Sequence, residues 1–182
     1  MSIRRVVTGH ENGRSVVVSD GSAPTEHQYS HIPGMTTSIL WAHDPNGSTE
    51  QIEGAPLGTT AIPYPGQARF LVVEFPPDPG VSDTGITEPH FDPALAAQEL
   101  ATHSPRFIEF FEADSPGMHK TPTVDFGVVL EGEIWLELDD GQQTLFKAGD
   151  VVVQQRTRHA WRNRSSSGAR MAFAMLGVSE NT

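Results

Sequence analysis

Short runs of apolar and β-branched residues recur along the chain, and glycine, proline, asparagine or aspartate separates most of them. Such runs are typical of β-strands, and their regular spacing with turn residues between them predicts an all-β sandwich or barrel. The strongest runs lie in the second half of the sequence. The predicted strands are 4–8, 15–19, 36–42, 69–75, 124–130, 134–138, 144–146, 151–154, 159–163 and 170–176.

Two features interrupt this pattern. Asn12-Gly13 lies between the first two runs and is a strong hairpin signal. The second feature is one helix over 94–102, which Asp92 can cap and for which Pro93 suits the first position. The excursion over 78–89 and this helix form a long interruption between strands. Such an interruption is usually functional, as a lid over a site, or unstructured, and a simple surface helix is the alternative interpretation.

The composition limits which partners and which kinds of metal site the protein can have. The 182 residues carry a net charge of −11, which disfavours nucleic acid and membrane surfaces as partners. There is no cysteine, so thiolate ligands, disulfides and thiol nucleophiles are excluded and any metal must be held by histidine and carboxylate groups. The first residues lack the apolar segment of a secretory signal, and no apolar run reaches the ~20 residues of a membrane span. We therefore expect a cytoplasmic protein.

One group of residues can carry chemistry. His119, Thr121 and Asp125 are separated by even numbers of residues, so on an extended strand they share a face. His159 begins a later strand that a closed barrel can bring beside them. Two histidines and one carboxylate would make the facial triad of non-haem iron centres. The alternative is that each histidine is an ordinary structural residue and that the aspartate lies in a turn.

Two segments resemble the conserved motifs of the cupin superfamily. Gly117–Gly132 runs from a glycine through His119 and an acidic residue to a glycine turn, as the first cupin motif does. The second motif is matched by the Gly-Asp start of 149–154 and by 159–163, which holds the histidine and an asparagine four residues later. The chain is identified as a small single-domain bacterial cupin of the conserved-barrel type, and the match is good over 107–176.

The resemblance implies an all-β fold. We expect a double-stranded β-helix, the jelly-roll or cupin barrel, with an N-terminal β extension and one short helix. The expected division is an extension over 1–66, which contains the hairpin and packs on the barrel or on a dimer partner, and a barrel over 67–182. Cupins commonly pair, so we expect a homodimer.

The sequence departs from the motifs at four positions. Thr121 replaces the second histidine of the first motif, and Asp125 replaces its glutamate. Gln154 stands at a proline position and Arg156 at a glycine position of the second motif. The resemblance then implies one divalent transition metal, with Fe(II) favoured and Mn, Ni or Zn as alternatives. Its expected ligands are His119, Asp125 and His159, with Thr121 as a weak or water-mediated addition.

The remaining site assignments follow from the same motifs. Asp125 and Gln154 are the candidate catalytic residues, the first as a base and the second as a polar contact to substrate or to metal-bound water. Trp161 and Phe126 are the candidate walls of a substrate pocket, and for Phe126 a place in the core is the favoured alternative. The expected function is a metal-dependent enzyme, dioxygenase-like or a lyase or isomerase, acting on a small organic molecule. The alternative is a metal-free cupin that binds a small ligand without catalysis.

Overall fold

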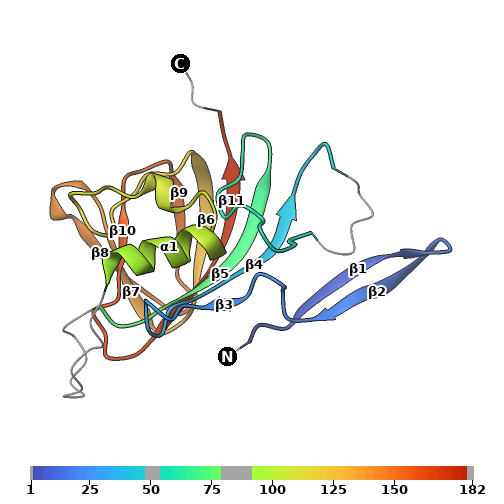
Figure 1. The fold of residues 1–182 in the computed structure, drawn as a ribbon, viewed down its shortest axis with the longest axis horizontal. Coiled ribbons are helices and arrows are strands. Elements are labelled where there is room, and N and C mark those ends of the chain that lie inside the picture. The colour runs from blue at the N-terminus through green and yellow to red at the C-terminus, as the bar shows by residue number, and fades with distance from the viewer. Residues whose placement is uncertain (1, 48–53, 79–91, 180–182) are drawn as a thin grey trace.

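The computed structural model of the chain describes residues 2–47, 54–78 and 92–179, which form mostly β-structure (Figure 1). Of the predicted excursion over 78–89, only Asp78 is among these residues. His90 also lies outside them. The strands are β1 (Arg5–Glu11), β2 (Arg14–Gly21), β3 (His27–Gln28), β4 (Thr36–His43), β5 (Ala68–Phe75), β6 (Thr123–Glu131), β7 (Glu133–Glu137), β8 (Gln143–Lys147), β9 (Val151–Gln155), β10 (Ala160–Arg162) and β11 (Ala169–Gly177). The helices are α1 (Pro93–His103) and the short 3₁₀ turns η1 (Ile108–Phe110) and η2 (Asp139–Gly141).

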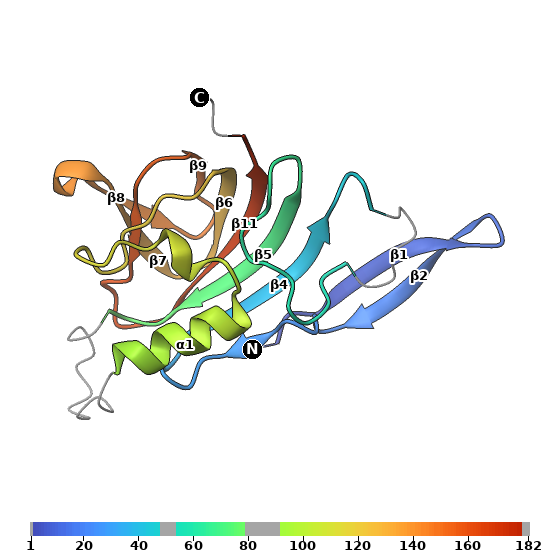
Figure 2. The same cartoon turned by 45° about the horizontal axis from the view of Figure 1, so that its top comes forward.

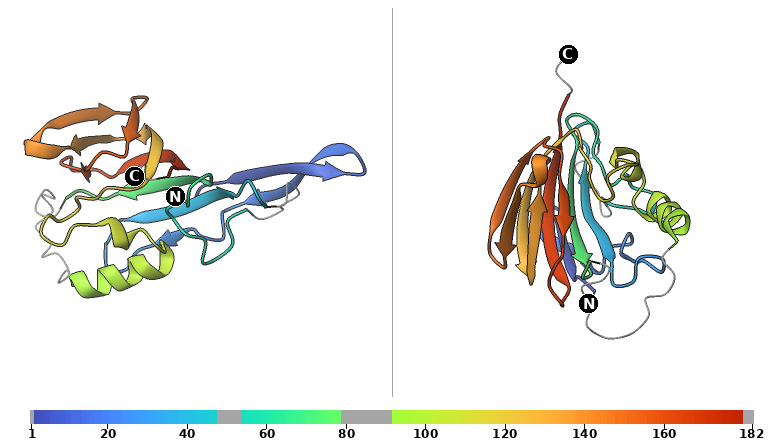
Figure 3. Two further views of the ribbon diagram at one scale, coloured as in Figure 1. Left: turned by 90° about the horizontal axis from the view of Figure 1, so that it is seen from above. Right: turned by 90° about the vertical axis from the view of Figure 1, so that its left-hand side faces the viewer.

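Two antiparallel sheets build the barrel (Figure 3). The larger sheet has the order β3-β4-β5-β11-β6-β9, and the smaller has the order β10-β7-β8. Strands distant in sequence are neighbours in the large sheet, since β11 at the end of the chain lies between β5 and β6. The predicted all-β jelly roll with one short α-helix is confirmed.

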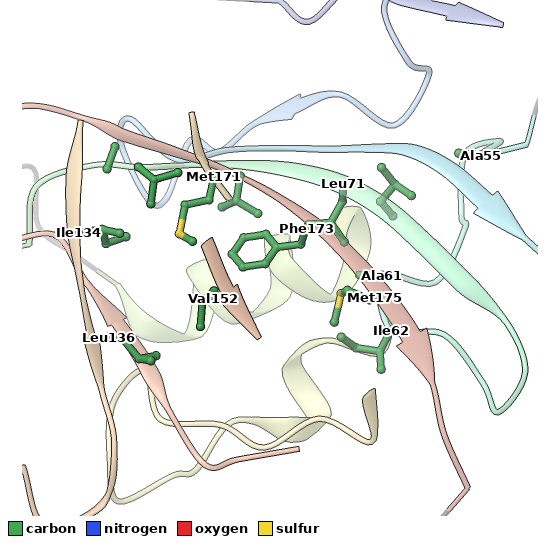
Figure 4. Close-up of a cluster of buried hydrophobic side chains, with 14 residues drawn as sticks. Ala55, Ala61, Ile62, Leu71, Ile134, Leu136, Val152, Met171, Phe173 and Met175 are labelled. Atoms are coloured by element: carbon green, nitrogen blue, oxygen red, sulfur yellow. The ribbon is translucent and has the colours of Figure 1, made fainter. Parts of the chain in front are cut away.

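The core lies between the inner faces of these sheets. On β6 burial alternates along the strand, so Thr123, Asp125, Gly127 and Val129 face inward. Figure 4 shows the core cluster, to which Val129 belongs, with Phe173 at its centre. A Cβ at residue 127 would lie 3.1 Å from this ring, so glycine is needed there for Phe173 to pack.

The N-terminal region contributes to the large sheet. Strand β4 pairs with β5 along its length, and Ile39 on β4 belongs to the main core. The sheet therefore continues across residue 66, the predicted boundary between extension and barrel. The β1–β2 hairpin is a separate two-stranded sheet that projects from the rest of the molecule (Figures 1 and 3). Asn12 and Gly13 form its turn with positive φ angles of 52° and 75°, as the sequence predicted.

Helix α1 lies over one face of the large sheet, close to β4 and β5 (Figure 2). The Asp92 carboxylate accepts from the amides of Ala94 and Leu95 at 2.9 and 3.2 Å, which confirms the predicted cap. Ala96 and Leu100 are its buried residues. Among the described residues no helix is long and apolar enough to cross a membrane.

Candidate functional site

A cavity of about 440 Å³ lies between α1 and the inner faces of the strands. This volume is within the range of about 300–1,000 Å³ that is usual for small-molecule sites. Helix α1 lines it with Leu100, so the helix closes one side of the cavity rather than lying on a remote surface. Most of the wall is apolar. The larger apolar side chains in it are Ile39, Leu71, Val73, Phe107, Phe111, Trp161, Phe173 and Met175.

His119 and His159 lie side by side in this wall. Each backbone amide donates to the carbonyl of the other residue at 2.9 Å, so the two residues form an isolated antiparallel bridge. Their ring centroids are 4.2 Å apart and the rings are inclined by 53°. The barrel topology therefore brings together the two histidines that the sequence singled out, across 40 residues of chain.

Both imidazoles have a fixed tautomer. The Nδ1 atom of His119 lies 3.0 Å from the Gly117 carbonyl, and Nδ1 of His159 lies 2.9 Å from the Thr157 carbonyl. Because a carbonyl only accepts, each Nδ1 carries the proton and each Nε2 keeps its lone pair. Within the described ranges no hydrogen bond reaches either Nε2. Metal-binding histidines are commonly oriented by this same Nδ1–carbonyl contact.

Burial keeps the two rings neutral. Burial and, to a smaller extent, the neighbouring His119 lower the pKa of His159 to about 4, against the opposing effect of the Thr157 carbonyl. Burial also lowers the pKa of His119, although Gly117 and Glu112 act in the opposite direction. At neutral pH both Nε2 lone pairs are consequently available to a cation or to a proton donor.

Asp125 also lines the cavity, with 5% of its surface exposed. Its Oδ1 atom is buried without a hydrogen-bond partner. Burial raises the pKa of this carboxyl to about 6, partly opposed by the Thr123 hydroxyl. Gln154 lies opposite Asp125 on β9 and is also buried, with an unpartnered Nε2. Two candidate catalytic residues are therefore neighbours, each with a polar atom that lacks a partner.

The predicted three-residue metal site is not assembled. In residues 2–47, 54–78 and 92–179, no group of three His, Asp or Glu side chains is placed to hold a metal ion. Asp125 lies within β6 while His119 precedes that strand, and neither imidazole is among the influences on the Asp125 pKa. The histidine pair leaves its two Nε2 atoms without a hydrogen bond among the described residues. The carboxylate does not complete a triad with them in this arrangement.

Thr121 and Trp161 both face the cavity. The Thr121 hydroxyl is buried and accepts from Thr123 Oγ1 at 2.8 Å, so it is engaged in the wall. The Trp161 ring contacts His159 edge to face at 6.2 Å between centroids, as a pocket wall should. The prediction that Phe126 is the other wall residue is wrong. It follows Asp125 on an extended strand, so it points to the opposite face and is 46% exposed.

Sequence reasoning missed several residues of the site. Phe107 and Phe111 pack on His119, with centroids 5.4 and 4.8 Å from its ring. Their spacing of four residues was the available signal, but nothing local linked them to residue 119. Arg158 is not free for an anionic ligand, because Glu112 binds it through two contacts of 2.6 and 2.7 Å.

Comparison with known proteins agrees with this architecture. Residues 108–175 match the family described as Cupin domain. The matched segment contains the histidine pair, Asp125 and Trp161. The family match thus coincides with one wall of the cavity, and β4, β5 and α1, which supply the remaining walls, lie outside it.

Curated relatives match a similar stretch. The protein is 48% identical over 62 residues to "Oryzines biosynthesis cluster protein J" of Aspergillus oryzae, covering 34% of this chain and 35% of that protein. It is 33% identical over 78 residues to the "Cupin-domain-containing oxidoreductase fogC" of Aspergillus ruber, covering 41% and 38%. The chain thus spans about a third of the length of these relatives. Both are fungal, and they lend no support to the expected bacterial type.

Solved structures with similar folds have low sequence identity. One is a putative ethanolamine utilization protein Q from Salmonella typhimurium, with a TM-score of 0.44 and 12% identity, covering 98% of this chain and 99% of that one. Another is the Cupin_2 domain of an XRE family transcriptional regulator from Enterobacter cloacae, with a TM-score of 0.40 and 12% identity over 80% and 99%. Likeness at this level carries no functional argument.

Proposed function

We propose that this protein is a cupin oxidoreductase that acts on a small, largely apolar organic molecule beside a metal ion held by His119 and His159. The observation that carries the proposal is the pair of neutral imidazoles with free Nε2 atoms in the wall of an apolar cavity. A buried cavity with few polar groups is the usual setting of a small-molecule site.

A divalent transition metal at this position would supply Lewis acidity toward a carbonyl or enolate oxygen of the substrate. Iron(II) is favoured, and manganese, nickel and zinc are the alternatives. His119 and His159 would hold the metal, each oriented through its Nδ1 proton. Trp161 and Phe173 would bind the apolar body of the substrate, and Leu100 of α1 would exclude water from it.

Asp125 is the proposed general base. Asp125 lines the cavity with an Oδ1 that has no hydrogen-bond partner, and a pKa of about 6 leaves the group largely ionised at pH 7 yet basic enough to take a proton. Gln154 stands beside it on the next strand, where its amide can donate to the carboxylate or to a polar group of the substrate.

The named relatives support oxidation as the reaction class. Several of the fungal proteins are called cupin-domain-containing oxidoreductases, including the virC protein of Hypocrea virens at 36% identity over 74 residues. Others are named for biosynthesis clusters, which fits a reaction on a small organic compound. Because the match covers about a third of each relative, substrate identity does not transfer with it.

A metal-free binding protein is the second candidate. It is favoured by the lack of a three-ligand group among the described residues and by Thr121 in the place of a second motif histidine. In that case His119 and His159 would accept hydrogen bonds from a ligand through the same Nε2 atoms. The cavity would bind the same class of molecule without converting it.

Oxygen uptake separates the two functions. Protein loaded with Fe(II) under anaerobic conditions is mixed with aerated buffer and a panel of small aromatic and diketone compounds. We expect substrate-dependent oxygen consumption that the His159→Ala variant loses and that His43→Ala, which removes an exposed histidine, retains. Compounds that bind, by calorimetry, without oxygen uptake or other turnover under any of the four metals would contradict the enzyme and favour the binding protein.

A further inference from the structure

The wall of the cavity contains no lysine or arginine. All 12 lysine and arginine residues of the chain lie within its described part, and none of them lines the cavity. The acidic side chains that line it, among the described residues, are Asp78 and Asp125. A carboxylate or phosphate ligand would therefore leave water without an ion pair to replace its hydration, which is costly in an apolar site.

Basic residues that adjoin the lining residues in the sequence are engaged elsewhere or exposed. Arg158 and Arg162 are each held by a glutamate at 2.6 Å. Arg106 donates to two backbone carbonyls at 3.1 and 3.0 Å. Lys120 and Arg164 are exposed. A cation could enter the cavity only by breaking such contacts or by leaving water, so the fold keeps positive charge out of this site.

The polar atoms of the lining residues are mainly hydrogen-bond acceptors. Nε2 of His119, Nε2 of His159 and Oδ1 of Asp125 have no hydrogen bond among the described residues. Asn163 also lines the cavity, but its amide nitrogen donates to two backbone carbonyls, at 3.0 and 2.7 Å. A ligand that complements this wall brings a hydrogen-bond donor rather than further acceptors.

The hydroxyl groups in the wall do not replace a cation. Those of Thr37 and Ser104 are hydrogen-bonded to the buried Tyr29 hydroxyl at 3.2 and 2.8 Å. The Thr121 hydroxyl accepts from Thr123 at 2.8 Å. Anions are bound most strongly by charged donors, and these hydroxyls are uncharged and already have partners. They offer a carboxylate or a phosphate only a weak site.

We propose that the substrate is an uncharged molecule with an apolar body and a hydroxyl group that donates to Asp125 Oδ1, and that carboxylates and phosphates are excluded. The inference rests on the proposed function, because it takes the cavity as the substrate site. The apolar body lies against Trp161 and Phe173. The hydroxyl hydrogen at Asp125 is also the proton that the proposed base would take.

Asp78 does not require a cationic substrate. Burial raises the pKa of Asp78, whereas the Asn163 amide, Arg162 and Arg164 act in the opposite direction. The charge of Asp78 is thus partly balanced by arginines that do not line the cavity. Asp125 is the other acidic group, and an ammonium ion held there would occupy the proposed base. An uncharged hydroxyl satisfies the same oxygen and leaves it able to accept a proton.

Matched ligands that differ in charge test the proposal. Benzyl alcohol, benzoate and benzylamine, with their naphthalene counterparts, are titrated by calorimetry into the whole chain, freed of metal because a bound metal would itself attract a carboxylate. We expect the alcohols to bind at least about tenfold more tightly than the carboxylates, and no more weakly than the amines. Asp125→Asn, which adds a donor at this position, should reduce the preference over carboxylates to about threefold or less. Asp114→Asn, at an exposed carboxylate, is the matched control and should keep it.

Equal binding of alcohols and carboxylates would overturn the proposal, as would tighter binding of the amines or no binding of any alcohol. The natural chain supplies these comparisons, so they do not depend on the folding of a variant. A folded Asp125→Asn that keeps the full preference would also overturn it. Oxygen uptake separates this inference from the proposed function. An alcohol preference without turnover contradicts the enzyme alone, and turnover of carboxylates in preference to alcohols contradicts the inference alone.

Discussion

At the scale of single residues, the candidate site depends on which nitrogen of each imidazole is occupied. His119 and His159 bind backbone carbonyls two residues before them through Nδ1, and this contact leaves Nε2 directed elsewhere. The surroundings also remove the charge that such rings would carry at slightly acidic pH. A neutral imidazole with an unoccupied Nε2 lone pair is the form in which histidine binds a metal ion. That form, present twice and side by side, is the physical basis of the proposed site.

Opposed titrations in the site predict an unusual pH dependence for Asp125→Asn. His159 has a folded pKa of about 4, below its ordinary 6.5, so its contribution makes the protein less stable as pH falls from 6.5 to 4. Asp125 has a folded pKa of about 6, above its ordinary 3.8, so its contribution makes the protein more stable as pH falls from 6 to 3.8. The two effects offset each other in the natural protein.

We expect Asp125→Asn to remove the contribution of Asp125, which stabilises the protein as pH falls. The free energy of unfolding of the variant should fall more steeply between pH 6.5 and 4 than that of the natural protein, by about 2–3 kcal/mol. Urea denaturation at several pH values measures it. Asp114→Asn, which changes an exposed carboxylate, should follow the natural curve. Parallel curves for Asp125→Asn and the natural protein would contradict the assigned burial of this carboxyl.

Arg156 offers a prediction about backbone conformation. It adopts a φ of 59°, a left-handed conformation that glycine takes readily and other residues take at a cost. This is the position where the second cupin motif has glycine. Arg156→Gly should stabilise the protein by up to about 1 kcal/mol. Arg164→Gly, at an exposed residue without positive φ, should destabilise it. Equal losses in both variants, measured by thermal unfolding, would refute this account.

Side-chain direction was partly accessible from the sequence. The even spacing of Thr121 and Asp125 correctly predicted that both face the interior. The same rule placed Phe126 on the opposite face, yet its aromatic character was given more weight than its position. Whether Asp125 joins the histidines could not be predicted, because spacing gives the face of a residue and not the path of the backbone between residues 119 and 123.

At the scale of elements, helix α1 is held against the sheet by one carboxylate. Glu99 accepts from the amides of Ser30 and His31, both at 2.8 Å, and from His27 Nε2 at 2.9 Å. Burial alone would raise the pKa of Glu99, but these donors hold it at about 2. The His27 ring also stacks on His103 at 3.4 Å between centroids. These two histidines are therefore part of the helix anchor.

Glu99→Gln should loosen this anchor. The variant keeps one acceptor and loses the charge, so we expect a loss of about 1–3 kcal/mol at pH 7 and faster hydrogen exchange in α1. Because the folded pKa of Glu99 is depressed, its contribution is present above pH 4.5 and is lost as pH falls toward 2. The difference between variant and natural protein should shrink over that range. Glu109→Gln, an exposed neighbour on η1, should be neutral, and an equally neutral Glu99→Gln would contradict the anchor.

Local signals were sufficient for the existence of α1 but not for its role. Asp92 and Pro93 fixed its start correctly. Its contact with the sheet depends on Glu99 meeting amides about 70 residues earlier in the chain, which no local pattern reports. No local pattern reports the cavity either, although Leu100 of this helix closes one side of it. The sequence left open whether the helix was a lid or a surface feature, and the structure places it in the cavity wall.

At the scale of the whole molecule, the chain order of the large sheet explains how a site arises here. Strand β11 lies between β5 and β6, and β9 completes the edge, so residues from three distant segments share one interior. The motif resemblance was sufficient to predict this fold because it covers these strands. It could not predict that β4 of the N-terminal region extends the same sheet, since no motif covers residues before 107.

The central claim is that His119 and His159 hold a metal ion through Nε2, and metal stoichiometry tests it most directly. Protein purified without chelators, and the same protein reconstituted with Fe(II), Mn(II), Ni(II) or Zn(II), is measured by ICP-MS after exhaustive dialysis. We predict about one metal ion per chain, lost in His119→Ala and in His159→Ala and kept in His43→Ala. No metal retained under any of these conditions, or retention that the first two variants do not change, would contradict the claim.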